Sequence, residues 1–143
     1  MNALFSAFNS FLGLSLSMTP FWLAPVCTAM APDGAPMKCY YSGLFVVAMG
    51  VAIVVFSLLS LACRGRGGSA FLSSFVAIAA AVACLLVPFG VIPLHGHGWA
   101  CGLCGNPAHA CRAVFMPRVL MIAAALVIVN VASLILAFVA GKR

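Results

Sequence analysis

Four long apolar stretches constrain the fold of this chain more than any other feature. They cover residues 3–26, 43–63, 70–94 and 119–140, and none of them contains Asp, Glu, Lys or Arg. A helix needs about 20 predominantly apolar residues to cross the hydrocarbon core of a bilayer. Hydrophobic residues make up 66% of the chain and charged residues 6%, which is far from the composition of a soluble domain. We therefore expect an all-α membrane protein, with residues 1–143 forming a single domain of four transmembrane helices.

The connections between these stretches predict the orientation of the chain. Residues 27–42 and 95–118 are long, polar and cysteine-bearing, whereas residues 64–69 form a short turn that contains Arg64 and Arg66. The last two residues are also basic, and basic residues are enriched in cytoplasmic loops. Disulfides persist in oxidising compartments, which favours the same orientation. We expect both termini in the cytoplasm and both cysteine-bearing loops outside it.

The net charge of +6 is divided between the two sides of the expected bundle. Seven basic residues on two faces form no continuous stripe of the kind that binds nucleic acid. We interpret them as anchors at the membrane surface, and we expect the lipid bilayer and no nucleic acid as a partner.

The two halves of the chain resemble each other, which predicts an internal repeat of two related hairpins. The first and third stretches share a proline motif, seen as Pro20, Phe21 and Pro25 and again as Pro88, Phe89 and Pro93. Met37-Lys-Cys39 likewise matches His109-Ala-Cys111. Because proline cannot donate to the helical hydrogen-bond ladder, we expect each proline pair to kink or unwind the outer end of its helix.

Small side chains gather in the third and fourth stretches, where they allow close approach between transmembrane helices. They are Ala77, Ala79, Ala80, Ala81 and Ala83, and Ala123, Ala124, Ala125, Ala132, Ser133 and Ala137. We expect these faces to contact helices within the bundle or in a partner protein. Asn130 is polar and lies in mid-stretch, so we expect it to hydrogen-bond to another helix. The uncharged stretches argue against a proton-coupled transporter or channel that acts alone.

Five of the seven cysteines lie in the two long connections, and they are Cys27, Cys39, Cys101, Cys104 and Cys111. The simplest interpretation is structural, with Cys27, Cys39, Cys104 and Cys111 forming two disulfides within or between the loops. Sequence cannot determine this connectivity. The other two cysteines, Cys63 and Cys84, are expected to behave as small hydrophobic residues.

The spacing of Cys101 and Cys104 supports an alternative with redox chemistry. A C-x-x-C motif lowers the pKa of a thiol and suits thiol–disulfide exchange. The layout of four helices with outer-loop cysteines is similar to that of quinone-linked oxidoreductases. Under this alternative Cys101 and Cys104 are catalytic, and a quinone is the cofactor.

A second alternative is a soft-metal site in the same connections. Thioether, thiolate and imidazole groups suit copper(I) or zinc. The donors that the sequence offers are Met37, Cys39, His95, His97, Cys101, Cys104, His109 and Cys111. Metal coordination and disulfide formation exclude each other at any one pair of cysteines. We expect no resident cofactor, and copper or zinc only under this alternative.

The residues around the cysteines resemble those of DUF4418, a domain-of-unknown-function family of small bacterial four-helix membrane proteins. The resemblance rests on Cys27, Met37-Lys-Cys39 and Gly102-Leu-Cys104-Gly-Asn-Pro before Cys111-Arg112, and it spans nearly the whole chain. His109 stands where the family usually has methionine, and Cys101 is additional to the family pattern. The resemblance implies the fold and a multi-pass location in the bacterial inner membrane, but no activity.

We therefore expect an integral membrane accessory or assembly subunit of a larger envelope complex. It would carry a disulfide-stapled extracytoplasmic cap and have no catalysis of its own. Other integral membrane proteins, such as transporter components, are the expected partners. Thiol–disulfide exchange and soft-metal binding remain the two alternatives.

Overall fold

Four α-helices account for most of the residues that the computed structural model describes. The described residues are 2–26, 34, 36–63, 67–87, 95–96, 99–100, 102–103 and 108–140. The helices are α1 (Asn2–Met18), α2 (Lys38–Ala62), α3 (Gly67–Leu86) and α4 (Met116–Ala140). A π-helical turn η1 (Thr19–Leu23) follows α1, and a second, η3 (Cys111–Phe115), precedes α4. The short strands β1 (His95–Gly96) and β2 (Trp99–Ala100) pair antiparallel.

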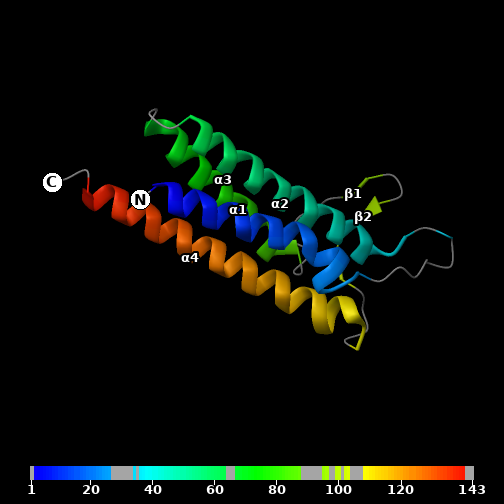
Figure 1. Cartoon of the computed structure of the whole chain (residues 1–143). Coiled ribbons are helices and arrows are strands. Elements are labelled where there is room, and N and C mark those ends of the chain that lie inside the picture. The colour runs from blue at the N-terminus through cyan, green and yellow to red at the C-terminus, as the bar shows by residue number, and fades with distance from the viewer. Residues whose placement is uncertain are drawn as a thin grey trace.

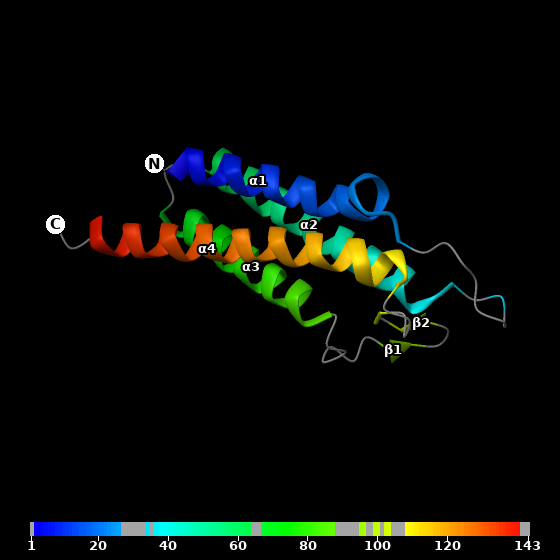
Figure 2. The same ribbon diagram turned by 90° about the horizontal axis from the view of Figure 1, so that it is seen from below.

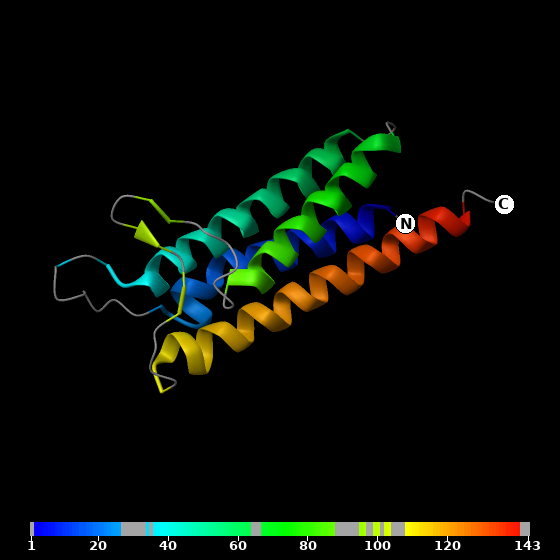
Figure 3. The ribbon, with the colours of Figure 1, turned by 180° about the vertical axis from the view of Figure 1, so that it is seen from behind.

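The helices pack side by side around a common core. α1 and α3 lie on opposite sides, and each contacts both α2 and α4 (Figure 1, Figure 3). Figure 2 shows β1 and β2 at one end of the helices and the two chain ends at the other. We call the first the loop end, where η1, β2 and η3 lie. We call the second the turn end, where α1 begins, α4 ends and α2 leads into α3.

The outward surface of the helices is apolar. Leu4, Trp22 and Ile128 are 75%, 87% and 68% exposed, respectively, at positions where a helix facing water would carry polar side chains. Two helical segments, Lys38–Ala62 and Cys111–Val139, are long and apolar enough to cross a membrane. The helix Phe71–Leu86 is apolar but shorter. We expected a helical protein with segments long enough to cross a membrane, and two helices meet this expectation.

The helix bounds differ from those expected from the apolar pattern. α2 begins at Lys38 rather than at residue 43, and helical structure before α4 begins at Cys111 rather than at residue 119. Hydropathy marks the stretch that suits hydrocarbon, whereas a helix continues as long as its backbone hydrogen bonds do. α3 ends at Leu86 rather than at residue 94. The following Pro88 explains this early end, because a proline disfavours helical geometry in the residue before it.

α1 and α2 approach each other most closely at Gly13 and Gly50. A Cβ atom added to Gly50 would lie 2.7 Å from the Gly13 carbonyl oxygen and 2.8 Å from the Ser17 backbone nitrogen. A Cβ atom added to Gly13 would lie 3.0 Å from the Gly50 carbonyl oxygen and from Ile53 Cγ2. The Ser17 hydroxyl donates to the Gly13 carbonyl at 3.0 Å, so this polar group is satisfied within α1. The two backbones therefore touch because neither glycine has a side chain.

A pair of amides joins α1 to α4. Asn9 Nδ2 donates to Asn130 Oδ1 at 2.8 Å, and Asn130 Nδ2 donates to Asn9 Oδ1 at 2.9 Å. Both side chains are buried. The prediction that Asn130 bonds to another helix is confirmed, whereas its partner Asn9 was not identified from the sequence. The pair matters because α1 and α4 pack less extensively than α1 and α2.

The first helix departs from α-helical geometry at the loop end, where its prolines predict a kink or unwinding. Pro20 has no backbone N–H and lies within η1, where Ala24 donates to the Thr19 carbonyl at 2.8 Å across a widened turn. The second turn, η3, ends two residues before Pro117 in α4. The corresponding motif of Pro88, Phe89 and Pro93 lies outside the described residues, so the internal repeat stays a prediction.

We predict that Gly50→Ala lowers the free energy of unfolding by about 1–3 kcal/mol, because the added methyl group forces α1 and α2 apart. This loss exceeds the roughly 1 kcal/mol that alanine gains over glycine in helix propensity. Thermal unfolding of the purified protein in detergent measures the effect. Gly102→Ala is the matched control, since its Cβ atom would make an ordinary contact of 3.7 Å with Lys38 Cδ. Equal stability of the two variants would contradict the prediction.

Candidate functional site

Two of the predicted loop cysteines are buried at the loop end. Cys39 lies in the first turn of α2, and Cys111 begins η3. Cys27, Cys101 and Cys104 lie outside the described residues, so the disulfide pairing and the C-x-x-C chemistry stay predictions. Among the described cysteines, which also include Cys63 and Cys84, no disulfide joins any two. Cys84 packs in the apolar core as a small hydrophobic residue, whereas Cys63 is exposed.

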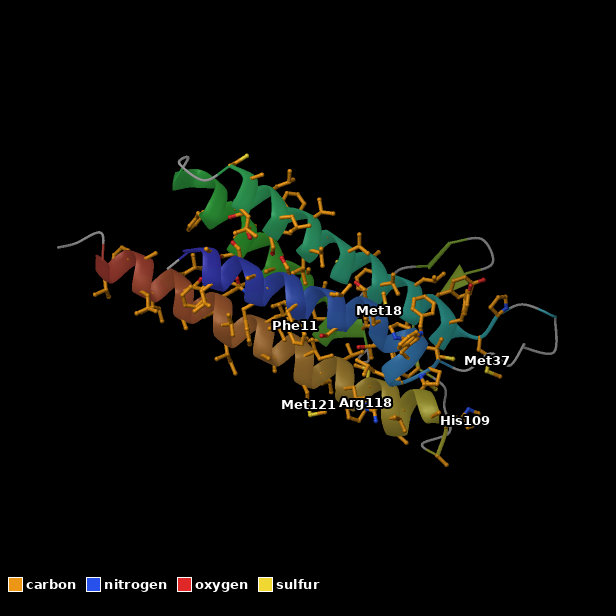
Figure 4. All side chains as sticks on the ribbon, viewed as in Figure 1. Phe11, Met18, Met37, His109, Arg118 and Met121 are labelled. Atoms are coloured by element: carbon orange, nitrogen blue, oxygen red, sulfur yellow. The ribbon has the colours of Figure 1, made fainter. Side chains whose placement is uncertain are left out.

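The predicted metal ligands are only partly placed by the structure. Met37 immediately precedes α2 and is half-buried, as is His109 before η3, and Figure 4 shows both at the loop end. His95 lies in β1 opposite Ala100, and His97 lies outside the described residues. Within the described ranges, no three His, Cys, Asp or Glu residues come together as a metal site. The metal hypothesis is therefore untested at the cysteines that it needs most.

Ser42 anchors the second long connection to α2. The Gly102 N–H donates to Ser42 Oγ at 2.8 Å, and the Ser42 hydroxyl is 2.9 Å from the Gly102 carbonyl oxygen, to which it donates. The same hydroxyl lies 3.3 Å from the Lys38 carbonyl, one turn earlier in α2. Gly102 stands within the C-x-x-C motif, and β2 also contacts α2. One side chain thus holds both backbone groups of a loop residue against the first turns of a helix.

Lys38, one turn before Ser42 on α2, lies near the same loop residue. Its Cδ and Cβ atoms would lie 3.7 and 3.9 Å from a Cβ atom on Gly102, so the lysine stem runs along the Gly102 backbone. Lys38 is exposed, as are Arg112 and Arg118. The described ionisable side chains of the loop end therefore give it a positive charge.

The residues that lead from α1 into the first connection pack against the first turns of α2. A Cβ atom on Gly43 would lie 2.9 Å from Val26 Cγ1 and 3.5 Å from Pro20 Cβ. Gly43 follows Cys39 by one helical turn, and both residues are buried on the same face of α2. The chain just before Cys27 therefore crosses α2 one turn away from Cys39.

His109 shapes the start of η3. Its carbonyl accepts hydrogen bonds from the backbone N–H groups of Arg112 at 2.9 Å and Ala113 at 3.0 Å. Its side-chain Nδ1 atom is buried and has no hydrogen-bond partner among the described residues. The histidine is thus a structural residue of this turn as well as a candidate ligand.

The residues that organise the loop end were not found from the sequence. Ser42 and Gly43 follow Cys39 closely in the sequence. Their small side chains beside a cysteine were the one pattern that could have identified them. The apolar pattern instead suggested that the helix starts at Gly43. Because α2 begins earlier, Cys39 and Ser42 lie on a helix face and not in a loop.

These observations define a class of helical protein with two membrane-length helices, in which Val26 and Gly102 lie against the start of the same helix. The family model of DUF4418, a domain of unknown function, matches residues 10–136. The chain belongs to this family, as its cysteine-flanking residues predicted. Comparison with curated proteins and with solved structures gives no match.

We predict that Ser42→Ala releases the second connection from α2 and destabilises the protein by about 1 kcal/mol, because both Gly102 hydrogen bonds are lost. Hydrogen exchange of the Gly102 amide should accelerate, and thermal unfolding should report the loss of stability. Ser15→Ala is the control, since the Ser15 hydroxyl bonds only to the Phe11 carbonyl within α1. Unchanged exchange at Gly102 in Ser42→Ala would show that other contacts hold the loop.

Proposed function

We propose that this protein is an integral membrane accessory or assembly subunit of a larger envelope complex, with no catalysis of its own. The observation that carries the proposal is the neutral interior of the described helices. Its buried side chains are apolar residues, hydroxyl groups and amides, while Lys38, Arg112 and Arg118 are exposed at the loop end. Ionisable groups inside a membrane protein are the usual marks of ion and proton pathways.

The proposal includes four transmembrane helices in the inner membrane. α3 has 20 residues and therefore a length of about 30 Å, which matches the hydrocarbon core. α1 reaches a similar length when η1 is added. The short basic turn with Arg64 and Arg66 supports a cytoplasmic turn end and an extracytoplasmic loop end.

Small residues on the outward surface support a helical partner. Ala77, Ala80 and Ala123 are buried within the packed helices, which accounts for part of the small-residue pattern. Ala124 and Ala132 on α4 instead face outward. A helix of another membrane protein can approach closely at such positions.

Contacts near Cys39 support a stapled cap. Val26 packs on Gly43, one turn from Cys39, and Cys27 follows Val26 directly. A disulfide needs Cα atoms about 4.4–6.8 Å apart. The contact of Val26 one helical turn from Cys39 supports a Cys27–Cys39 disulfide in the proposed cap.

We predict that the protein purified from native membranes in mild detergent carries a stoichiometric polytopic membrane protein. Ala124→Leu with Ala132→Leu should reduce the recovered partner at least several-fold, because the larger side chains block close helix approach. Ala48→Leu on the outward face of α2 is the matched control and should keep the partner. Recovery of the wild-type protein as an isolated chain would contradict the proposed function.

A membrane thiol–disulfide oxidoreductase is the second candidate, and the position of the Lys38 side-chain stem near Gly102 favours it. An ammonium group beside a C-x-x-C motif stabilises the thiolate that starts disulfide exchange. Soft-metal binding has no comparable support among the described residues.

Thiol counting separates the two candidates. Alkylation and mass spectrometry should find four of the cysteines of the long connections locked in disulfides that resist mild reduction. A Cys101–Cys104 disulfide that opens readily would instead support the oxidoreductase, and Lys38→Gln should then slow alkylation of the reduced pair, with Arg118→Gln as the control. Near-stoichiometric copper or zinc in the purified protein would contradict both disulfide hypotheses for the ligating cysteines.

A further inference from the structure

All four helices contribute polar side chains to the interior near the turn end. We call this group the polar layer, and its members are Ser6, Asn9, Ser57, Ser60, Ser73, Ser74, Asn130 and Ser133. All except Ser133 are buried, and Ser133 is half-buried. The core toward the loop end is mainly apolar, with Leu16, Val46, Cys84, Phe115 and Val119. Its buried hydroxyls, on Ser17, Thr19 and Ser42, donate to backbone carbonyls. Hydrogen bonds between side chains of different helices are therefore concentrated near the turn end.

Most of the polar layer is joined by hydrogen bonds between helices. The Asn9 and Asn130 amides bond to each other, as described above. The Ser6 hydroxyl donates to Ser60 Oγ at 3.5 Å, which joins α1 to α2. The Ser74 and Ser133 hydroxyls lie 3.4 Å apart and join α3 to α4. The hydroxyl contacts are long for O–H···O hydrogen bonds, so these groups retain capacity for a further partner.

Ser57 differs from the bonded members of the polar layer because its hydroxyl lacks a partner in the described part of the chain. It is fully buried, and its Oγ atom has no hydrogen-bond partner among the described residues. On α2 it lies between Ile53, which packs on Gly13, and Ser60, which bonds to Ser6. On α1, Asn9 lies between Gly13 and Ser6, the partners in these two contacts. Ser57 and Asn9 therefore lie at the same height along the helix axes. A buried hydroxyl without a partner is costly, which points to a further group at this level.

We propose that the polar layer binds water, with the Ser57 hydroxyl as one of its ligands. The described members of the layer are all neutral, so they offer no countercharge to an ion. Hydroxyls of adjacent helices lie 3.4–3.5 Å apart, which is long for a hydrogen bond but leaves space beside them only for a guest of the smallest size. Buried water typically makes about three hydrogen bonds to groups that would otherwise lack partners. Ser57, with the remaining lone pairs of Asn9 and neighbouring hydroxyls, supplies such a set.

The surroundings of the layer define where this water comes from. Among the described side chains of α4, none from Val131 to Val139 is buried. On the other side, Leu16 and Leu126 belong to the apolar core. The polar layer lies toward the turn end with the mainly apolar core on its other side, so we expect its water to exchange with solvent at the turn end and to fill only part of the depth of the bundle. This inference concerns the interior alone and stands apart from the function proposed for the cap.

Water-edited solid-state NMR of the full-length protein in lipid bilayers tests the proposal. Polarisation transfer from water should reach Ser57 and Asn9 at least several-fold faster than it reaches Val46, which is equally buried in the apolar half. Transfer to Ser57 no faster than to Val46 would overturn the proposal. This measurement uses the wild-type protein and does not depend on the folding of a variant.

Thermal unfolding of Ser57→Ala gives a second, independent test. If water is bound, the variant removes one of its ligands, so its Tm should fall and transfer to Asn9 should slow. If the site is dry, the variant removes an unsatisfied hydroxyl, so its Tm should rise, and that result would overturn the proposal. Ser15→Ala is the control, and its Tm should stay unchanged.

Discussion

The contact between the backbones of α1 and α2 at Gly13 and Gly50 is the constraint on which the rest of the structure depends. It sets how closely the two helices run and therefore where the end of α1 meets the start of α2. Pro20 and Val26 then pack against Gly43 at the loop end, while Ser6 meets Ser60 at the turn end. The polar layer and the loop end are both consequences of this one close approach, because helices are stiff and their register is shared along their length.

The loop end is organised by α2 rather than by the loops themselves. The first turns of α2 present Cys39, Ser42 and Gly43 on or next to one buried face. Val26, just before the first connection, packs on Gly43, and Gly102 of the second connection bonds to Ser42, so both contacts lie within one helical turn of Cys39 along α2. A structural cap and a redox site would use this arrangement equally well, since each needs cysteines from two loops held at fixed positions.

The interior contacts between the helices differ in kind along the helix axis. The apolar half holds the helices together through packing, and the polar layer adds directional contacts between specific pairs such as Asn9 and Asn130. Interhelical hydrogen bonds of this kind are worth roughly 0.6–2 kcal/mol in membranes. Their larger effect is on register, because the two amides pair only when α1 and α4 are correctly aligned.

The sequence by itself determined the helical class, the family and the interhelical role of Asn130, because apolar length and isolated polar residues are local properties of the chain. It also identified the unwinding at Pro20, which follows from the missing N–H of that residue. Only the tertiary structure decided that Asn9 is the partner of Asn130, that Ser42 holds Gly102, and that Ser57 is buried without a partner. Those facts depend on how distant segments align, and alignment follows from close packing at Gly13 and Gly50, which no local pattern records.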